Sequence, residues 1–370
     1  MRNGFTTGSC AAAASKAAMY MLITGKDKKS ISIDTPKGIA YTTDILDIQR
    51  TEDSVTCAVK KDSGDDPDIT NGMLIYSTVT FAGKENSKNY NVLIDGGEGV
   101  GRVTKPGLDQ NVGEAAINSV PRQMIEKEVR EVCDLFDIEE DVKVIISVPG
   151  GKEIALKTFN PKLGIEGGIS IIGTSGIVEP MSTKALLDTI KLELKQRKEL
   201  GYDYVAVSPG NYGLDFMRDT YGYDLDKSVK CSNYIGNTID MAVELGFKDI
   251  LFVGHIGKLI KVAGGIMNTH SKEADCRMEI LSAIGIKHSV PYEVLDKILD
   301  CVTTEEACRL LKDCDKCDEV CSDAAERICS NLERRSGGNL KVECIIFSKE
   351  LGELAKSSGA KDYIKRLTSE

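Results

Sequence analysis

The sequence predicts two domains: an α+β domain at residues 1–164 and a Rossmann-like α/β domain with a mostly parallel sheet at residues 165–370. Two observations support this prediction. The 370 residues exceed what one hydrophobic core usually supports. Short strand-like runs separated by Gly, Asp and Asn turns fill the first part, whereas from about Ile165 a strand, a glycine loop and a helix follow one another repeatedly, which is typical of a parallel sheet with covering helices.

In the first domain, an alanine-rich helix is expected from Ser9, which can cap it, to about Thr24, where Gly25 supplies a left-handed stop. A second helix is expected at about residues 111–136. The expected strands are residues 30–34, 54–59, 74–81, 91–95 and 142–148.

In the second domain, the clearest helix runs from Thr183 to Leu200, because its leucines and Ile190 fall on one face and Gly201 follows its end. A cysteine-rich helical insertion is expected near residues 300–335. The expected strands are residues 169–172, 204–207, 229–231, 250–253 and 342–347.

Composition excludes several classes of protein. The longest apolar runs fall far short of the roughly 20 residues that a bilayer requires, and Lys16 interrupts the first run, so neither a membrane span nor a signal peptide is expected. The net charge of −10, with no block of Lys or Arg, argues against a nucleic-acid partner. The 12 cysteines are interpreted as reduced thiols of a cytoplasmic protein.

Glycine loops follow the expected strands of the second domain, and in open α/β sheets ligands bind at that edge. They are GTSG, SPGNYG, SNYIGN and GHIGK. The residues that these loops offer to a ligand, which the resemblance described below implies to be a cosubstrate, are Gly173, Thr174, Ser175, Gly176, Gly210, Asn211, Gly213, Asn233, Gly236 and Gly254.

The GHIGK loop shows the sharpest pattern. Gly254 and Gly257 let the backbone approach a ligand closely. Lys258 and Lys261 share one face of the helix that follows, where a bound anion would relieve their repulsion from the helix dipole. The alternative is a tight turn with solvated lysines, and the spacing does not decide between the two.

His255, His270 and Asp275 are the candidate catalytic residues, because imidazole transfers protons near neutral pH and Asp275 is the acid close by in the sequence. The alternative is that the histidines are structural.

Two glycine segments of the first domain are further candidates. GGEGVGRVTKPG is similar to a dinucleotide fingerprint, but Arg102 stands where the third glycine belongs and Pro106 blocks the helix. It remains either a ligand-contacting loop with Arg102 and Lys105, or a surface hairpin. FTTGSC offers Thr7, Gly8 and Ser9 at a helix N-terminus, as an anion or adenosine contact or as a simple cap.

The cysteine-rich segment contains the minimal thiolate pair Cys314-x-x-Cys317. A second C-x-x-C is missing, and helical phase places Cys314, Cys317 and Cys321 on one face. Packing is therefore the favoured interpretation, and no metal ion is assigned. An iron–sulfur or cobalt-handling redox protein stays as an alternative that depends on these cysteines.

Several long strings resemble the CbiD family of cobalamin biosynthesis, in family order from Phe5 to about Gly285. The strings are FTTGSCAAAASKAA, KDSGDDPDITNG, GGEGVGRVTKPGL, AAINSVPRQMI, TFNPKLGIEGGISIIGTSGIVEPMS, SPGNYG, CSNYIG and GHIGKLIKVAGGIMNTHSKEADCRME. The tail beyond Cys301 lies outside the resemblance.

The resemblance implies methyl transfer from S-adenosylmethionine to C1 of cobalt-precorrin-5B, giving cobalt-precorrin-6A, with cobalt present only as part of the substrate. An anionic corrinoid precursor calls for basic side chains around a wide cleft. The residues proposed to bind it are Arg102, Lys105, Arg122, Gly257, Lys258, Lys261 and Arg277. A non-catalytic carrier of the corrinoid is the alternative, and a homo-oligomer and contacts with neighbouring enzymes of the pathway are left open.

Overall fold

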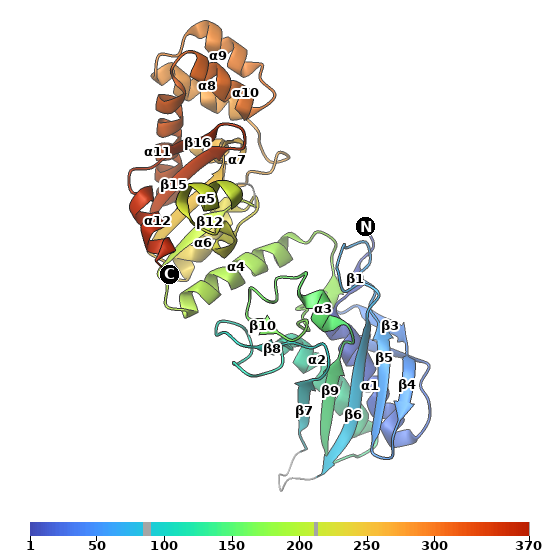
Figure 1. Ribbon diagram of the computed structural model, residues 1–370. Coiled ribbons are helices and arrows are strands. Elements are labelled where there is room, and N and C mark those ends of the chain that lie inside the picture. Colours follow the sequence, from blue (N-terminus) through green and yellow to red (C-terminus); the bar gives the residue numbers. More distant parts are fainter. Residues whose placement is uncertain (84–89, 211–213, 370) are drawn as a thin grey trace. The chain divides into compact units, whose positions relative to one another are not determined.

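The structure is a computed structural model that describes residues 1–83, 90–210 and 214–369 (Figure 1). The chain divides into two compact units, Met1–Ser182 and Thr183–Glu370. The division lies later than the expected boundary at residue 164, because β10 (Ile165–Glu166) and β11 (Ile177–Val178) pair with strands of the first unit. No helix in the described part of the chain is both long enough and apolar enough to cross a membrane.

The first unit contains three helices and the first eleven strands among its described residues. Besides β10 and β11, these elements are β1 (Gly4–Phe5), α1 (Thr7–Thr24), β2 (Ser30–Asp34), β3 (Ala40–Asp44), β4 (Leu46–Arg50), β5 (Ser54–Lys60), β6 (Leu74–Gly83), β7 (Val92–Gly96), β8 (Arg102–Val103), α2 (Ser119–Leu135), β9 (Asp141–Ser147) and α3 (Gly151–Ala155).

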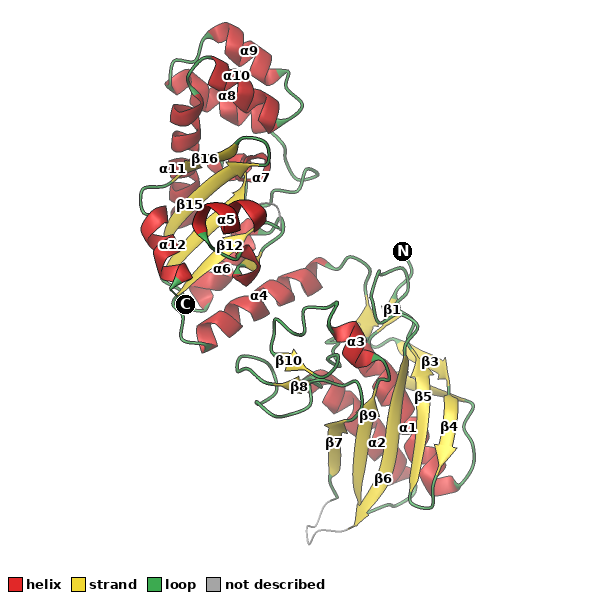
Figure 2. Ribbon diagram, in the orientation of Figure 1, coloured by secondary structure: helices red, strands yellow, loops and turns green. Residues whose placement is uncertain are grey.

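Its main sheet has the order β4-β5-β6-β9-β7, antiparallel except for the parallel pair β7 and β9. Figure 2 shows α1 and α2 together on one face of this sheet. The alanines Ala11–Ala14 of α1 are fully buried, and their small side chains let α1 lie close to both α2 and the sheet.

Two details of the first unit differ from the expectations. Thr6, not Ser9, caps α1, since the Thr6 hydroxyl accepts a hydrogen bond from the Ser9 N–H. The second helix begins only at Ser119, because residues before it form bridges: Ala115 with Arg102, and Ile117 with Ile171.

The second unit alternates strands and helices. Its elements are α4 (Thr183–Glu199), β12 (Tyr204–Ser208), α5 (Leu214–Tyr221), the 3-10 turn η1 (Leu225–Lys227), β13 (Val229–Lys230), α6 (Ile235–Glu244), β14 (Asp249–His255), α7 (Ile256–Ala263), α8 (Arg277–Lys287), α9 (Tyr292–Leu299), α10 (Thr304–Asp313), α11 (Cys317–Arg335), β15 (Lys341–Ser348), β16 (Gly352–Lys356) and α12 (Ala360–Thr368).

Its sheet has the order β13-β12-β14-β15-β16, with the first four strands parallel and β16 antiparallel at one edge. Successive residues of each strand are buried on opposite faces: Ile250 and Phe252 pack with α6, α7 and α11, whereas Leu251 and Val253 pack with α5 and α12. Helices therefore cover both faces of this sheet. The expected strand at residues 169–172 is not part of it, since Ile169 and Ile171 bridge to the first unit.

A helical group, α8 to α11, lies between β14 and β15 in the chain and beyond the sheet in Figure 1. It begins at Arg277, earlier than the expected insertion near residues 300–335. The long helix α11 extends from this group along the sheet, where it packs against α7 and β15.

Candidate functional site

The candidate site of the second unit is the edge at which the parallel strands end. β12, β13 and β14 end at Ser208, Lys230 and His255, and their parallel pairing brings these ends to the same edge. The chain enters α7 directly after β14. We call residues Gly254–Lys258 the lysine turn.

His255 caps α7 and is held at both ring nitrogens. Its Nδ1 accepts a hydrogen bond from the Gly257 N–H at 3.1 Å, which leaves the proton of the neutral ring on Nε2. That Nε2 lies 2.7 Å from Oε1 of Glu305 in the first turn of α10, and the ring stands edge-on to Phe347. For His255 to accept a proton, as predicted, its Nδ1 would therefore have to give up the hydrogen bond that caps α7.

Glu305 is a site residue that the sequence prediction missed. It is far from His255 in the chain, and only the fold of the helical group brings the two side chains together. The acid expected beside His255 was Asp275, but that carboxylate pairs with Arg277, with Nε–Oδ1 2.5 Å and Nη2–Oδ2 2.9 Å. The charges of Asp275 and Arg277 are thus paired with each other.

Lys258 is a cation of this edge with few partners among the described residues. Its half-buried ammonium group donates one hydrogen bond, to the Pro209 carbonyl at 3.3 Å. Among the described residues, no carboxylate lies within 4 Å of its Nζ. Burial lowers the pKa of Lys258 below its usual range, and the charge of Lys261 lowers it further, against an opposing effect of Cys231. A bound anion near Lys258 would raise this pKa again, because it would stabilise the charged ammonium group.

Lys261, in contrast, is a structural residue. Its side chain is buried and donates hydrogen bonds to the carbonyls of Thr269 at 3.3 Å and Ala274 at 2.8 Å, with Asp275 at 3.8 Å. Lys261 therefore holds the loop after α7 and has little capacity left for a ligand. His270, on the same loop, is exposed and accepts a hydrogen bond from the Lys272 N–H at its Nδ1.

The glycines and amides expected to bind a cosubstrate fall into two groups. Gly236 and Asn233 hold the loop after α7, since the Gly236 N–H donates to the Met267 carbonyl and Asn233 accepts both the N–H and the hydroxyl of Thr269. Gly254 packs against Leu259. A Cβ atom at Gly210 would have no described atom within 4 Å, and Asn211 and Gly213 lie outside the described residues.

The N-terminus of α1 and the loop 173–176 form a closed contact within the first unit. The Gly8 N–H donates to the Ile172 carbonyl, the Thr7 hydroxyl donates to the same carbonyl, and the Ser9 hydroxyl donates to the Gly176 carbonyl. A side chain at Gly173 would collide with Thr6. The same loop folds back elsewhere too: the Ser175 hydroxyl donates to the Ile177 carbonyl, whereas the neighbouring Thr174 is exposed.

The three basic residues proposed in the first unit differ in their surroundings. Arg102 makes a bidentate pair with Asp95, at 2.8 and 3.0 Å. Arg122 donates to the carbonyls of Ile94, Ala115 and Ile117, so it ties the end of β7 to the segment before α2. Lys105 is exposed.

The segment Gly96–Gly101, here called the glycine loop, is not a surface hairpin, because β8 pairs with β10 and its glycines lie against neighbouring backbone. A Cβ atom at Gly99 would lie 1.8 Å from the Val148 carbonyl oxygen, and one at Gly168 would lie 2.2 Å from the Gly99 oxygen. Gly99 also adopts φ +71°. Its glycines are required because three stretches of backbone cross in contact here.

The chain is similar to known proteins over its whole length. The model of the CbiD family matches residues 1–180, and that of the CbiD C-terminal domain matches residues 268–358. The chain therefore belongs to the CbiD family. This confirms the resemblance, and the second match adds the tail that the resemblance left out.

Two relatives, from Ruminiclostridium cellulolyticum and Alkaliphilus metalliredigens, are 46% and 47% identical, each covering 100% of this chain and 96% of the relative. Both are named cobalt-precorrin-5B C(1)-methyltransferase. A crystal structure of a cobalamin biosynthesis protein, cbiD, from Archaeoglobus fulgidus is 27% identical, covers 71% of this chain and 80% of that chain, and superposes with a TM-score of 0.38.

Proposed function

We propose that this protein transfers the methyl group of S-adenosylmethionine to C1 of cobalt-precorrin-5B. The observation that carries the proposal is the similarity of the entire chain to relatives with that name, at 46% and 47% identity. The methyl donor follows from the chemistry: a sulfonium methyl group is activated for attack by an electron-rich ring carbon.

In this reaction the C1–CH₃ bond forms as the S–CH₃ bond breaks, and the bonding pair leaves with sulfur as a neutral thioether. The ring gains one positive charge, which the loss of one proton relieves. Catalysis then depends mainly on holding the two reactants in line. This suits a site in which His255 is held at both nitrogens and Asp275 is paired with Arg277.

For the second unit we propose a Rossmann-like domain with its ligands at the carboxyl edge of the parallel strands. Lys258 contacts a carboxylate of the corrinoid precursor, since it is a half-buried cation without a carboxylate partner among the described residues. The cosubstrate is placed at Gly210, where no described atom would contact an added Cβ. Thr7, Gly8 and Ser9 are left out of the proposal because they already bind the carbonyls of Ile172 and Gly176.

A cytoplasmic location accompanies this proposal, because a reducing compartment suits 12 free thiols. The activity is tested by incubating the purified protein anaerobically with cobalt-precorrin-5B and methyl-labelled S-adenosylmethionine. Label is expected in the corrinoid product, and an active His255→Asn variant is expected because Asn also caps helices. A folded protein that transfers no label would refute the proposal.

The alternative function, a carrier that binds the corrinoid without chemistry, is separated by calorimetry. A methyltransferase binds S-adenosylmethionine or its demethylated product, whereas a carrier binds only the corrinoid. The relatives' names favour the methyltransferase.

A further inference from the structure

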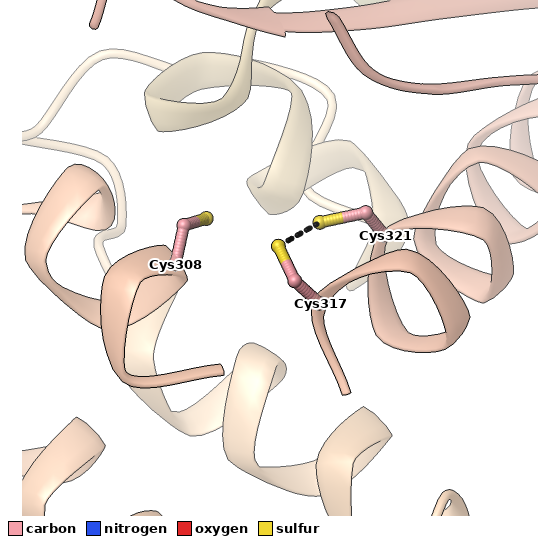
Figure 3. A group of neighbouring side chains, drawn as sticks. All are labelled: Cys308, Cys317 and Cys321. Atoms are coloured by element: carbon pink, nitrogen blue, oxygen red, sulfur yellow. Dashed lines mark hydrogen bonds between the residues drawn. The ribbon is translucent and has the colours of Figure 1, made fainter. Parts of the chain in front are cut away.

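Three cysteines of the helical group meet at one point. Cys308 on α10 and Cys317 and Cys321 on α11 are buried, and their sulfurs all lie within 4.8 Å of one another. Figure 3 shows the three sulfurs turned toward a common centre between the two helices. Simple packing does not require this convergence, because a thiol packs equally well against the apolar side chains around it.

The separation of two of the three sulfurs matches that of a tetrahedral thiolate site. Cys317 Sγ and Cys321 Sγ are 3.8 Å apart. Two thiolates bound to one zinc ion at about 2.3 Å, with a tetrahedral angle between them, lie at about the same separation of ~3.8 Å. Cys317 and Cys321 are one helical turn apart, while Cys308 approaches from the other helix, so the three donors surround the centre from different sides.

The local charge also suits a cation. Cys317 is the first residue of α11, where the helix N-terminus favours a thiolate. Hydrogen bonds from the thiols of Cys308 and Cys321 lower the pKa of Cys317, with a smaller contribution from Lys312. Binding of a metal ion would release the thiol protons of its cysteine ligands, because thiolates are the form that binds the metal.

We propose that Cys308, Cys317 and Cys321 bind a divalent zinc ion that joins α10 to α11. Cys314, three residues before Cys317, supplies the fourth ligand. It is half-buried in the turn between the two helices, which Asp315 makes with φ +58°, and the C-x-x-C spacing is typical of zinc sites. Its sulfur now donates to the Leu311 carbonyl at 3.4 Å, so it turns inward when the metal binds.

Such an ion would stabilise more than the helical group. Cys308 lies one helical turn after Glu305 on α10, and Glu305 pairs with His255 at the lysine turn. α11 in turn packs against β15 and α7. Fixing α10 against α11 therefore also fixes the carboxylate that orients His255, and this inference does not depend on the proposed methyl transfer.

The experiment uses the full-length protein, purified anaerobically without chelators after exposure to Zn²⁺, and elemental analysis. About one zinc ion per chain is expected. Cys317→Ser should lose it. Cys329→Ser is the matched control, since Cys329 is also a buried thiol of α11 but lies outside the cluster, and it should keep the ion.

A second probe is independent of the variants. Co²⁺ added to the metal-free wild type should give intense sulfur-to-cobalt charge-transfer absorption, which Zn²⁺ then abolishes. The proposal is overturned if the wild type binds neither ion, if Cys329→Ser loses zinc as Cys317→Ser does, or if the bound metal is iron with acid-labile sulfide.

Discussion

The glycine loop of the first unit and the lysine turn of the second unit have similar glycine-rich sequences, but the structure uses them in opposite ways. In the glycine loop, Gly99 lies in backbone contact with Val148 and Gly168, and no space is left for a side chain at Gly99. In the lysine turn, the Gly257 N–H is used by the His255 cap, and the cation Lys258 has a single carbonyl partner among the described residues.

The comparison teaches that glycine content does not itself indicate a binding site. Glycine permits close approach of the backbone, but the approaching group is either a ligand or another stretch of the same chain. The difference is found in the charged side chains. Arg102 beside the glycine loop is paired with Asp95, whereas Lys258 is half-buried and its pKa is lowered.

The largest expected effect is that of Gly99→Ala. The new methyl group would collide with the Val148 carbonyl, and the φ of +71° is already unfavourable for alanine. We expect the free energy of unfolding to fall by about 3–5 kcal/mol, measured by urea denaturation. Gly113→Ala is the control, with φ +94° but nothing within 4 Å, and should cost only about 1–2 kcal/mol. Equal losses would mean that the backbone crossing is unimportant.

The sequence predicted the repeated strand and helix order of the second unit well, because the buried strands read as apolar runs that end at glycine loops. The strand expected at residues 250–253 lies within β14 (Asp249–His255), and the helix expected from Thr183 is α4 (Thr183–Glu199). The strand predicted at residues 169–172 for the second unit was wrong, because residues of this apolar run form isolated bridges within the first unit.

The site was predicted less completely than the fold. Periodicity placed Lys258 and Lys261 on one helical face, but it could not tell that Lys261 is buried under the loop that follows. Glu305 and the cluster of Cys308 with Cys317 depend on contacts between elements that are distant in the chain. Such contacts are set by tertiary packing, which leaves no periodic signal in the sequence.

The two lysines provide the next test. Lys261→Met should lower the free energy of unfolding by about 2–3 kcal/mol, because the carbonyls of Thr269 and Ala274 lose a charged donor. Lys258→Met should leave stability unreduced, since it removes a partly desolvated charge, and should weaken corrinoid binding by about 10-fold or more. Thermal unfolding and calorimetry measure the two effects. If Lys258→Met instead lowered the stability and Lys261→Met weakened corrinoid binding, the proposed roles of the two lysines would be wrong.

The smallest effect concerns pH. Lys258 has a lowered pKa, first through burial and then through Lys261. Corrinoid affinity should therefore fall as the pH rises toward this lowered value, before an ordinary lysine with a pKa of about 10.4 would lose its proton. Bound carboxylates oppose this loss, because they favour the charged amine. In Lys258→Arg the affinity should stay constant over the same range, since arginine keeps its charge.

The same group gives a stability change of defined sign in the ligand-free protein. Between the lowered pKa of the folded state and the ordinary pKa of the unfolded state, the unfolded chain binds more protons at Lys258. The stability of the wild type relative to Lys258→Met should therefore rise with pH through this window, as the penalty of the buried charge disappears. Urea denaturation at successive alkaline pH values measures it. A difference that stays flat would show that Lys258 is fully solvated, and the lysine turn would then resemble the glycine loop in having no site for an anion.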